Sequence, residues 1–599
     1  MRTRIVPFCL GAALNCTAFA ATHYVDLDNA SPTSPYTSWI TAATNIQDAV
    51  DASIAGDEIV VTNGLYNTGG RAVGTNIIVN RVAVDKAVVL RSANGPAVTT
   101  IQGFQLPGTT NGDGAIRCVF LTNGASLFGF TLTGGATRTN GNNSLEQGGG
   151  GLCAASLSSI VSNCVIVGNS AAQLGGGCRL SNLYNCVLAG NSGSMGGGSC
   201  FSTLTDCALS NNVASSRGGG AYSGSLTNCV ITANSAANGN PGSTASGGGA
   251  ASCSVLFNCV LSRNYAEGGG GGIGDDSGFG SQRLYNCILS TNVATLGGGA
   301  WNARLINCIV IGNRATVGGG AHCMPYGTSL TNCLIVGNVA TGTGGGVNAG
   351  YPSILNNCTI VGNLAPRAGG INSTVSGTLV AVANNCIVYS NVATNGTNFL
   401  NGLYNFCCTT PSPASGIGNI TNAPAFVDHA TDDFRLQAAS PCINAGNSSY
   451  LNADLDLVGN PRIAGDTMDI GAYEFQSPPS ALSYAWAQQY GVPTDGAADF
   501  LDPDGDGMNN WQEWHCLTNP TNALSVLKLL TPVGDVFGVT VSWPSVTGRT
   551  YWLERATNLG ASPAFSTIAS NLAGVGDTKS YLDANAVGQH LFLYRVGVQ

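Results

Sequence analysis

The first candidate for chemistry is an acidic loop near the C-terminal end of the sequence. Residues 502 to 513 read Asp-Pro-Asp-Gly-Asp-Gly-Met-Asn-Asn-Trp-Gln-Glu, which matches the calcium pattern D-x-D-x-D-G-x5-E at every defined position. Neighbouring carboxylates repel one another unless a hard cation neutralises them, and Ca2+ prefers oxygen ligands. We predict a structural Ca2+ site, with an Asp-rich solvated turn as the alternative. The predicted ligands are Asp502, Asp504, Asp506, the Met508 carbonyl, Asn510 and Glu513.

Carbohydrate chemistry is the second candidate, and it needs closely placed acids. Glycoside hydrolysis uses paired carboxylates about 5–9.5 Å apart. From residue 148 to 426 the acids are Asp206, Glu267, Asp275 and Asp276. The best place for a lyase-like site is an inserted Gly-rich loop and its flanks, which carry Asp275, Asp276, Arg283 and Arg304. A solvated loop explains these residues more simply, so we assign no catalytic residue.

A sequence repeat predicts the secondary structure that would position these residues. Ten Cys recur at separations of 21 to 30 residues, nine of them directly after Asn, and each is followed by Asn five residues later. These Cys are Cys164, Cys186, Cys207, Cys229, Cys259, Cys287, Cys308, Cys333, Cys358 and Cys386. Short β-type runs follow the Cys, and Gly triplets such as 318–320 precede most copies. This period predicts one coil of a β-solenoid for each copy.

Stacked coils would place equivalent residues above one another at about 4.8 Å. The Cys are then expected to face inward as a ladder, for which the reduced form is preferred and oxidation of some pairs stays open. Asn suits the turns because it tolerates the left-handed region, and stacked amides can bond to each other. His322, the one histidine of the ten coils, is interpreted as structural.

The repeat resembles the right-handed β-helix superfamily that includes pectate lyases and polymorphic outer-membrane proteins. The resemblance rests on Gly318-Gly319-Gly320-Ala321 and Asn313-Arg314-Ala315, and it covers roughly residues 145 to 395. It implies an all-β, right-handed parallel β-helix and says little about activity. Residues 526–599 are too few for an outer-membrane translocator barrel, which argues against an autotransporter mechanism.

The N-terminal residues predict export. Met1-Arg2-Thr3-Arg4, an apolar run from Ile5 to Leu14 and Ala18-Phe19-Ala20 are typical of a signal peptide over residues 1–20, with a buried helix as the alternative. We therefore expect an extracellular or cell-surface protein. Residues 42–55 have apolar side chains at helical spacing and predict a helix that caps the first coil.

Three further segments follow the coils, which we expect to span residues 21–425. Residues 426–476 resemble the choice-of-anchor Q domain through Ser440-Pro441-Cys442-Ile443-Asn444-Ala445-Gly446 and Asp469-Ile470-Gly471-Ala472-Tyr473-Glu474, which implies surface display or export. Residues 477–525 are predicted to be a helical linker whose loop resembles thrombospondin type 3 repeats. Residues 526–599, with alternating Val539, Val541 and Trp543, predict a small β-sandwich that loosely resembles fibronectin type III domains.

The charge composition of the chain limits the classes of partner that it can bind. Only 9% of residues are charged, the net charge is −9, and no Lys lies between Lys86 and Lys528. A phosphate-binding surface needs clustered basic residues, so nucleic acid is not expected as a partner. No later apolar run reaches the roughly 18 residues of a membrane span. We predict a non-catalytic binding, adhesive or structural protein whose partner is a polysaccharide or cell-surface glycan. The alternative is a carbohydrate-active enzyme, with a polysaccharide lyase favoured.

Overall fold

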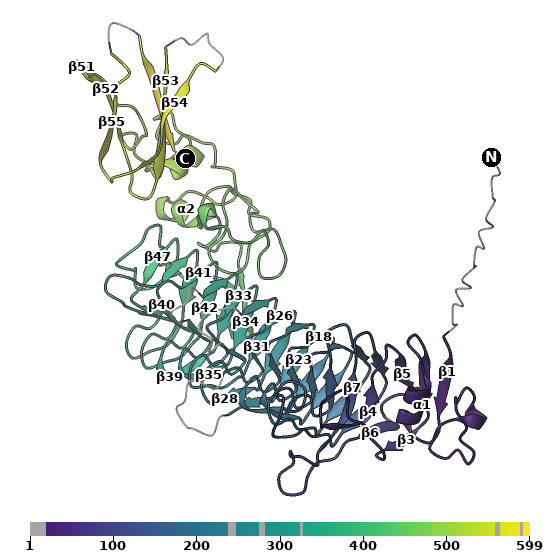
Figure 1. Cartoon of the computed structure of the whole chain (residues 1–599). Helices are drawn as coiled ribbons and strands as arrows, with labels where there is room; N and C mark the ends of the chain where they lie inside the picture. The colour runs from purple at the N-terminus through teal and green to yellow at the C-terminus, as the bar shows by residue number, and fades with distance from the viewer. Residues whose placement is uncertain are drawn as a thin grey trace, which may run out of the picture. The chain divides into compact units, whose positions relative to one another are not determined.

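The computed structural model describes residues 20–237, 247–274, 282–323, 328–557, 563–587 and 591–598. The chain divides into two compact units, residues 1–208 and 209–599. Three long parallel sheets, named A, B and C, contain most of the strands (Figure 1). Most of the predicted signal peptide and the acids Asp275 and Asp276 lie outside the described residues.

Sheet A has 15 strands that follow one another in chain order. They are β1 (Thr22–Val25), β2 (Glu58–Val61), β5 (Val89–Ser92), β8 (Ser126–Phe128), β11 (Ile160–Ser162), β14 (Asn182–Tyr184), β18 (Thr203–Thr205), β22 (Ser225–Thr227), β26 (Val255–Phe257), β30 (Arg283–Tyr285), β33 (Arg304–Ile306), β37 (Ser329–Thr331), β41 (Ile354–Asn356), β44 (Val382–Asn384) and β47 (Leu403–Asn405).

Sheet B has 14 strands in the same kind of order. They are β3 (Gly64–Tyr66), β6 (Thr99–Gln102), β9 (Thr131–Thr133), β12 (Val165–Val167), β15 (Val187–Ala189), β19 (Ala208–Ser210), β23 (Val230–Thr232), β27 (Val260–Ser262), β31 (Ile288–Ser290), β34 (Ile309–Ile311), β38 (Leu334–Val336), β42 (Thr359–Val361), β45 (Ile387–Tyr389) and β48 (Cys408–Thr409).

Sheet C has 13 strands. They are β4 (Val79–Val84), β7 (Ile116–Leu121), β10 (Leu152–Ala154), β13 (Cys178–Arg179), β17 (Ser199–Cys200), β21 (Ala221–Tyr222), β25 (Ala251–Ser252), β29 (Ile273–Gly274), β32 (Ala300–Trp301), β36 (Ala321–Cys323), β40 (Val347–Gly350), β43 (Ile371–Thr374) and β46 (Phe399–Leu400). Smaller parallel pairings join β16 (Ser192–Met195), β20 (Val213–Arg217), β24 (Ser235–Ala236) and β28 (Tyr265–Ala266), and also β35 (Arg314–Val317) and β39 (Val339–Thr343).

From β4 onward, each coil contributes one strand to sheet C, then one to A, then one to B. Parallel strands joined by crossover connections adopt the right-handed arrangement almost without exception. The predicted fold class is therefore confirmed: the chain is a right-handed parallel β-helix. In the three-residue strands of sheet A the middle residue points into the coil, as the fully buried Leu284, Leu305 and Leu330 show. The flanking residues of the same strands point outward.

Two side-chain ladders follow the coil axis within unit 2, as the repeat predicted. The Cys of the ladder are buried, and a typical member, Cys308, donates its thiol to the Ile306 carbonyl at 3.3 Å. The Asn five residues on are buried too, and Asn313 Nδ2 donates to Asn338 Oδ1 at 2.9 Å. Asn at the preceding turn, such as Asn307, has φ of +54°. The redox state of the Cys stays a prediction.

Gly triplets allow neighbouring coils to approach closely. A Cβ on Gly319 would lie 2.5 Å from the Gly345 carbonyl oxygen of the next coil, so no larger residue fits there without moving the backbone. Gly318 has φ of +67°, a conformation that L side chains rarely adopt. The triplets are therefore explained by packing between coils.

The first coil carries helix α1 (Ile46–Ala52), within the segment where the sequence predicts a helix. Asn45 caps it by accepting a hydrogen bond from the Asp48 amide at 2.9 Å. Gln47 is buried and pairs with the backbone of Ala83 in β4, whose N–H donates to Gln47 Oε1 at 2.8 Å. The helix thus satisfies polar backbone groups of β4 and covers apolar side chains.

Residues 426–476 lie against the outer face of sheet B. Their strands are β49 (Phe426–Asp428) and β50 (Asp433–Leu436), and their 3-10 turns are η2 (His429–Thr431) and η3 (Ser448–Tyr450); a third, η1 (Trp39–Thr41), lies in the first coil. Phe426, Phe434 and Ile470 form one buried cluster with Val336 and Ile387 of sheet B. The segment therefore covers the flank of the coils around 334–389.

The C-terminal part contains two short helices and two small sheets. Helix α2 spans Tyr484–Tyr490 and helix α3 spans Asn510–Cys516. Two antiparallel three-stranded sheets follow, in the orders β51-β52-β55 and β54-β53-β56, and they form the small β-sandwich that the sequence predicted. The strands are β51 (Val533–Asp535), β52 (Gly538–Pro544), β53 (Thr550–Ala556), β54 (Ser566–Ala573), β55 (Thr578–Asp583) and β56 (Leu593–Val598). Among the described residues, no helix has the length and apolar character to cross a membrane.

His322 of β36 makes stability depend on pH. Burial lowers the pKa of its imidazole from 6.5 to about 4, and the Asn348 amide donates to its Nδ1 at 3.0 Å. A base with a depressed folded-state pKa is protonated first in the unfolded chain, so acidification from about pH 6.5 to 4 should lower the free energy of unfolding by up to about 3 kcal/mol. Urea unfolding of wild type and of His322→Asn across this pH range measures how much His322 changes the free energy of unfolding. If that free energy varied with pH equally in the two proteins, the prediction would be wrong.

Candidate functional site

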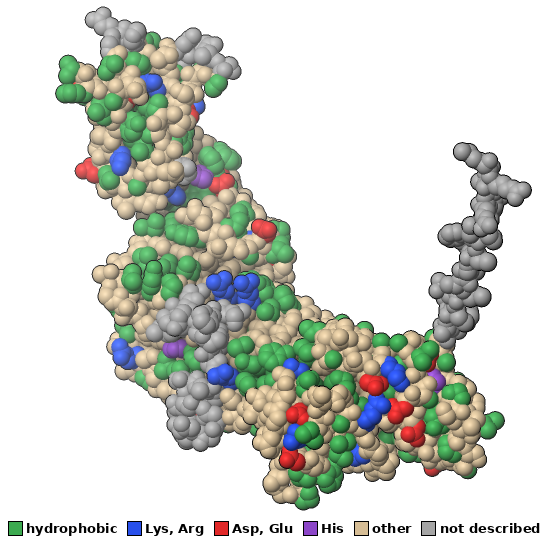
Figure 2. All heavy atoms as spheres, viewed as in Figure 1, with side chains coloured by type: hydrophobic (Ala, Val, Ile, Leu, Met, Phe, Trp, Pro, Cys, Tyr) green, Lys and Arg blue, Asp and Glu red, His purple; other side chains and the backbone are tan. Residues whose placement is uncertain are grey.

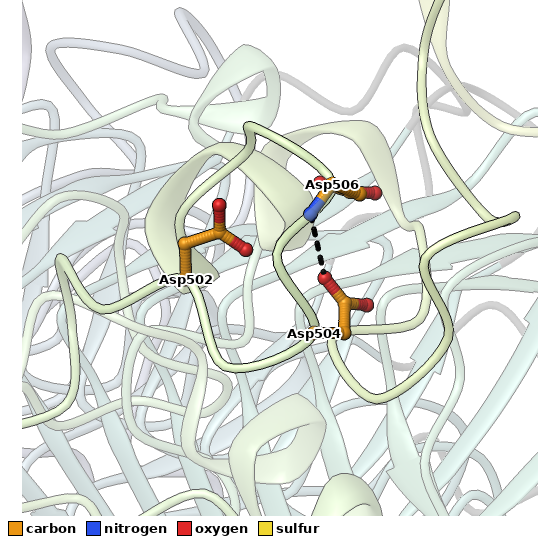
Figure 3. A group of neighbouring side chains, drawn as sticks. All are labelled: Asp502, Asp504 and Asp506. Atoms are coloured by element: carbon orange, nitrogen blue, oxygen red, sulfur yellow. Dashed lines mark hydrogen bonds between the residues drawn. The ribbon is translucent and has the colours of Figure 1, made fainter.

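The predicted calcium loop brings three aspartates together. Single carboxylate oxygens of Asp502, Asp504 and Asp506 all lie within 4.8 Å of one another (Figure 3). The turn is held by its own carboxylates, because Asp502 accepts hydrogen bonds from the amides of Gly505 at 2.8 Å and Gly507 at 3.0 Å. Gly507 has φ of +95°, which is the sharp turn that the motif requires at this position.

Helix α3 brings two more predicted ligands to the loop. Asn510 and Glu513 are three residues apart and so share one face of the helix. Asn509 caps this helix by accepting from the Gln512 amide at 2.9 Å, which fixes where the helix begins. The Asn510 amide group donates to the Ala498 carbonyl at 2.8 Å, so its oxygen is left for another partner. Met508, at the position expected to offer its carbonyl, lies between loop and helix.

Unpaired oxygens test whether these residues suit a cation. Four buried oxygens in the loop and helix have no hydrogen-bond partner, namely Asp504 Oδ2, Asp506 Oδ2, Asn510 Oδ1 and Glu513 Oε2. Glu513 is fully buried and Asn510 is 2% exposed. A buried acceptor without a partner loses about 1–3 kcal/mol of hydration, more if it is charged. These are oxygen donors of the kind that Ca2+ prefers, and two of them belong to the close aspartate group, so the donor set fits Ca2+.

The electrostatics of the site also favour a bound cation. Burial, together with the charges of Asp504, Asp506 and Asp502, raises the pKa of the Glu513 carboxyl to about 7. Thr518 Oγ1 donates to Glu513 Oε1 at 3.2 Å and lowers the pKa slightly. Without a cation, Glu513 is therefore held among like charges that disfavour its ionised form.

A second acidic cluster, in residues 454–475, accepts hydrogen bonds from the backbone of the same part of the chain. Arg462, Asp456, Asp469 and Glu474 are buried together. Asp469 accepts from the amides of Asn444 and Phe475 at 2.8 and 2.7 Å, and Asp456 accepts from the Glu474 amide at 3.1 Å. Arg462 donates to the carbonyl oxygens of Asp469 and Gly471. Through these hydrogen bonds with backbone groups the cluster joins the turns of the segment.

The outer face of sheet A carries a group of side chains that sequence reasoning identified only in part. Arg283 and Arg304, named above for a lyase-like site, are register partners on β30 and β33. Phe257 and Tyr285, which the sequence analysis did not single out, are register partners on β26 and β30. Each of these two aromatic residues lies two residues before a ladder Cys, so alignment of the repeats on Cys would have revealed them. On the face drawn in Figure 2, Lys, Arg, Asp and Glu side chains gather over the N-terminal coils and are fewer over the later ones.

Comparison with known proteins adds likenesses in structure. No family model matches the chain, and no curated protein matches it. The pectate lyase Pel9A is similar at 15% identity and a TM-score of 0.27, covering 76% of this chain and 96% of the lyase. The Dettilon tailspike protein gp208 is similar at 12% identity and a TM-score of 0.33, covering 64% and 68%. The A-module of the Azotobacter vinelandii mannuronan C-5 epimerase AlgE6 is similar at 13% identity and a TM-score of 0.26, covering 63% and 94%.

Proposed function

We propose that this chain is an exported β-helix protein of the cell surface or extracellular space, with a non-catalytic role in binding glycans. The observation that carries the proposal is the composition of the coils. Of the described residues from 209 to 426, Glu267 is the single carboxylate. Paired acids are the usual requirement for glycoside hydrolysis, whereas a neutral face of amide, hydroxyl and aromatic groups suits binding.

The remaining segments fit the same proposal. The resemblance of residues 426–476 to the choice-of-anchor Q domain favours surface display, and their packing on sheet B makes them part of the coil flank. Residues 526–599 would then serve as a fibronectin type III-like module. The signal peptide proposed for residues 1–20 accounts for export.

The calcium loop belongs to this proposal as a structural site. Asp502, Asp504, Asp506, Asn510, Glu513 and the Met508 carbonyl would hold one Ca2+. Bound calcium supplies positive charge to a cluster of carboxylates and ligands to the unpaired oxygens. The chain's own part is to hold the loop on α3, whose Trp514 packs with Trp486 and Leu482 of the α2 region. The ion would thereby tie the loop to this small core.

A polysaccharide lyase is the second candidate, because Arg283 and Arg304 stand side by side on sheet A. Lyases of the β-helix superfamily abstract a proton with a basic residue. The acids proposed to accompany these arginines, Asp275 and Asp276, lie outside the described residues.

Binding and turnover assays on the purified mature chain distinguish the two functions. We expect retention on immobilised polysaccharide and no unsaturated uronate product from polygalacturonate or alginate. Product formation that is lost in Asp275→Ala plus Asp276→Ala would overturn the non-catalytic proposal. A lack of binding to every acidic and neutral polysaccharide would overturn glycan binding itself.

A further inference from the structure

The outward residues of three consecutive sheet A strands form one small patch in unit 2. In β26, β30 and β33 the first residue of each strand is Val255, Arg283 or Arg304, and the third is Phe257, Tyr285 or Ile306. Register pairing places the first residues in one column and the third residues in another. Because the strands are about 4.8 Å apart, these side chains lie within the reach of a single short oligosaccharide.

Two arginines in the first column form the basic part of the patch. Arg283 and Arg304 are exposed register partners, and like charges directly opposite on neighbouring strands destabilise a sheet. Within the described part of the chain, neither guanidinium forms an ion pair with a carboxylate, whereas Arg91, Arg138 and Arg462 each do. Arg binds carboxylate or sulfate groups through its planar fork of N–H donors. The pair therefore favours a ligand with closely spaced anionic groups.

An aromatic pair lies beside the arginines. The rings of Phe257 and Tyr285 are stacked, with centroids 4.9 Å apart and planes 6° from parallel. The Phe257 side chain is 38% exposed, so the stack forms a rigid apolar surface in contact with solvent. Aromatic rings offer large contact area with little loss of side-chain freedom, and the C–H face of a sugar ring can pack on them.

The patch continues over the following turn into a hollow. Asn258 and Asn286 are exposed, and Asn286 Nδ2 donates to Asn258 Oδ1 at 3.1 Å. Beyond them a hollow of about 410 Å³ is bounded by Asn286, Asn307 and the loop at Leu455 to Gly459. Amide groups at the rim are donors and acceptors for hydroxyl groups. Charge, apolar contact and neutral hydrogen bonding are thus available on one continuous surface.

These observations together select one kind of ligand. We infer that the sheet A patch formed by Phe257, Arg283, Tyr285 and Arg304 binds an acidic polysaccharide, with anionic groups on the arginines and a sugar ring against the aromatic pair. The inference rests on the proposed glycan binding and specifies its substrate class and place. A nucleic acid fits less well, since the chain carries a net charge of −9 and no Lys between Lys86 and Lys528.

Calorimetry on the mature full-length chain tests the inference with four probes: polygalacturonate for carboxylates, chondroitin sulfate for sulfates, neutral dextran, and a single-stranded oligonucleotide. The double variant Arg283→Gln plus Arg304→Gln is compared with Arg314→Gln, an exposed arginine on β35. Tyr285→Ala is compared with Tyr265→Ala, whose side chain is 44% exposed on β28. Circular dichroism and urea midpoints show that each variant is folded.

We expect one or both acidic polysaccharides to bind wild type, with affinity about tenfold or more lower in the double arginine variant and about fivefold lower in Tyr285→Ala. Both control variants should match wild type. Acidic glycan binding that is unchanged in the double variant would overturn this site and leave glycan binding intact. Binding of dextran but of neither acidic polysaccharide would have the same consequence. The site would also be overturned if Arg314→Gln weakened acidic glycan binding as much as the double variant does and the oligonucleotide bound as well. Absence of binding to all four probes would overturn both the site and the proposed function.

Discussion

Glu513→Gln should abolish the calcium-dependent stabilisation of residues 480–525 and, at the same time, stabilise the calcium-free protein. In the absence of a cation, burial and three aspartates raise the pKa of Glu513 to about 7. Because the glutamate of the unfolded chain ionises near pH 4, this raised pKa lowers the stability of the calcium-free loop as the pH rises from about 4 to 7, and the full loss is present above pH 7. A neutral Gln of the same size removes this penalty of about 3 kcal/mol and also removes the bidentate calcium ligand.

Local hydrogen exchange by mass spectrometry measures this effect in the full chain. In wild type, calcium at about 100 times its dissociation constant should slow exchange in peptides from this segment by an amount equivalent to about 2.7 kcal/mol. In Glu513→Gln, exchange should be slower than wild type without calcium and unaffected by calcium. Asp495→Asn, an exposed acid of the same segment outside the loop, is the matched control and should respond to calcium as wild type does. A calcium response that survives Glu513→Gln would show that the loop binds no ion through this residue.

The buried Asn ladder predicts a second large effect. Asn338 is fully buried; its amide group donates to the carbonyl of Val310 and to Asn363 Oδ1, both at 2.9 Å. Its oxygen accepts from the backbone N–H and the side chain of Asn313, also at 2.9 Å. Asn338→Asp replaces both donations by contacts between acceptors and buries a charge, which should destabilise the protein by about 3 kcal/mol or more at neutral pH.

Urea denaturation at two pH values checks this prediction. Protonation of the new carboxyl restores one donor, so the loss in midpoint should be smaller at pH 4 than at pH 7 when each value is compared with wild type at the same pH. Asn286→Asp is the control, because Asn286 is an exposed turn residue of a neighbouring column. A midpoint for Asn338→Asp that equals wild type at pH 7 would mean that the ladder contributes little to stability.

The coil could be predicted because its signal is local and repeated. Cys308, Asn313 and the triplet 318–320 each satisfy a requirement set by the coil directly above or below, and the same requirement recurs in every repeat. The D-x-D-x-D-G loop is likewise a contiguous stretch in which one turn positions most ligands. Its fit to a cation became clear only from the unpaired oxygens of Asn510 and Glu513. Those oxygens depend on hydrogen bonds to Ala498 and Thr518, which the motif does not include.

The sequence by itself determined the fold class, the two ladders and the position of the acidic loop, because periodic and contiguous patterns report local geometry directly. Tertiary structure alone decided that Phe257 and Tyr285 stack and that Arg283 lies beside Arg304. It also decided that residues 426–476 cover sheet B. Such neighbours are separated by 21 residues or more along the chain, and the loops between coils vary in length. Which outward side chains meet therefore depends on the register of stacking, and that register is set by the buried ladders.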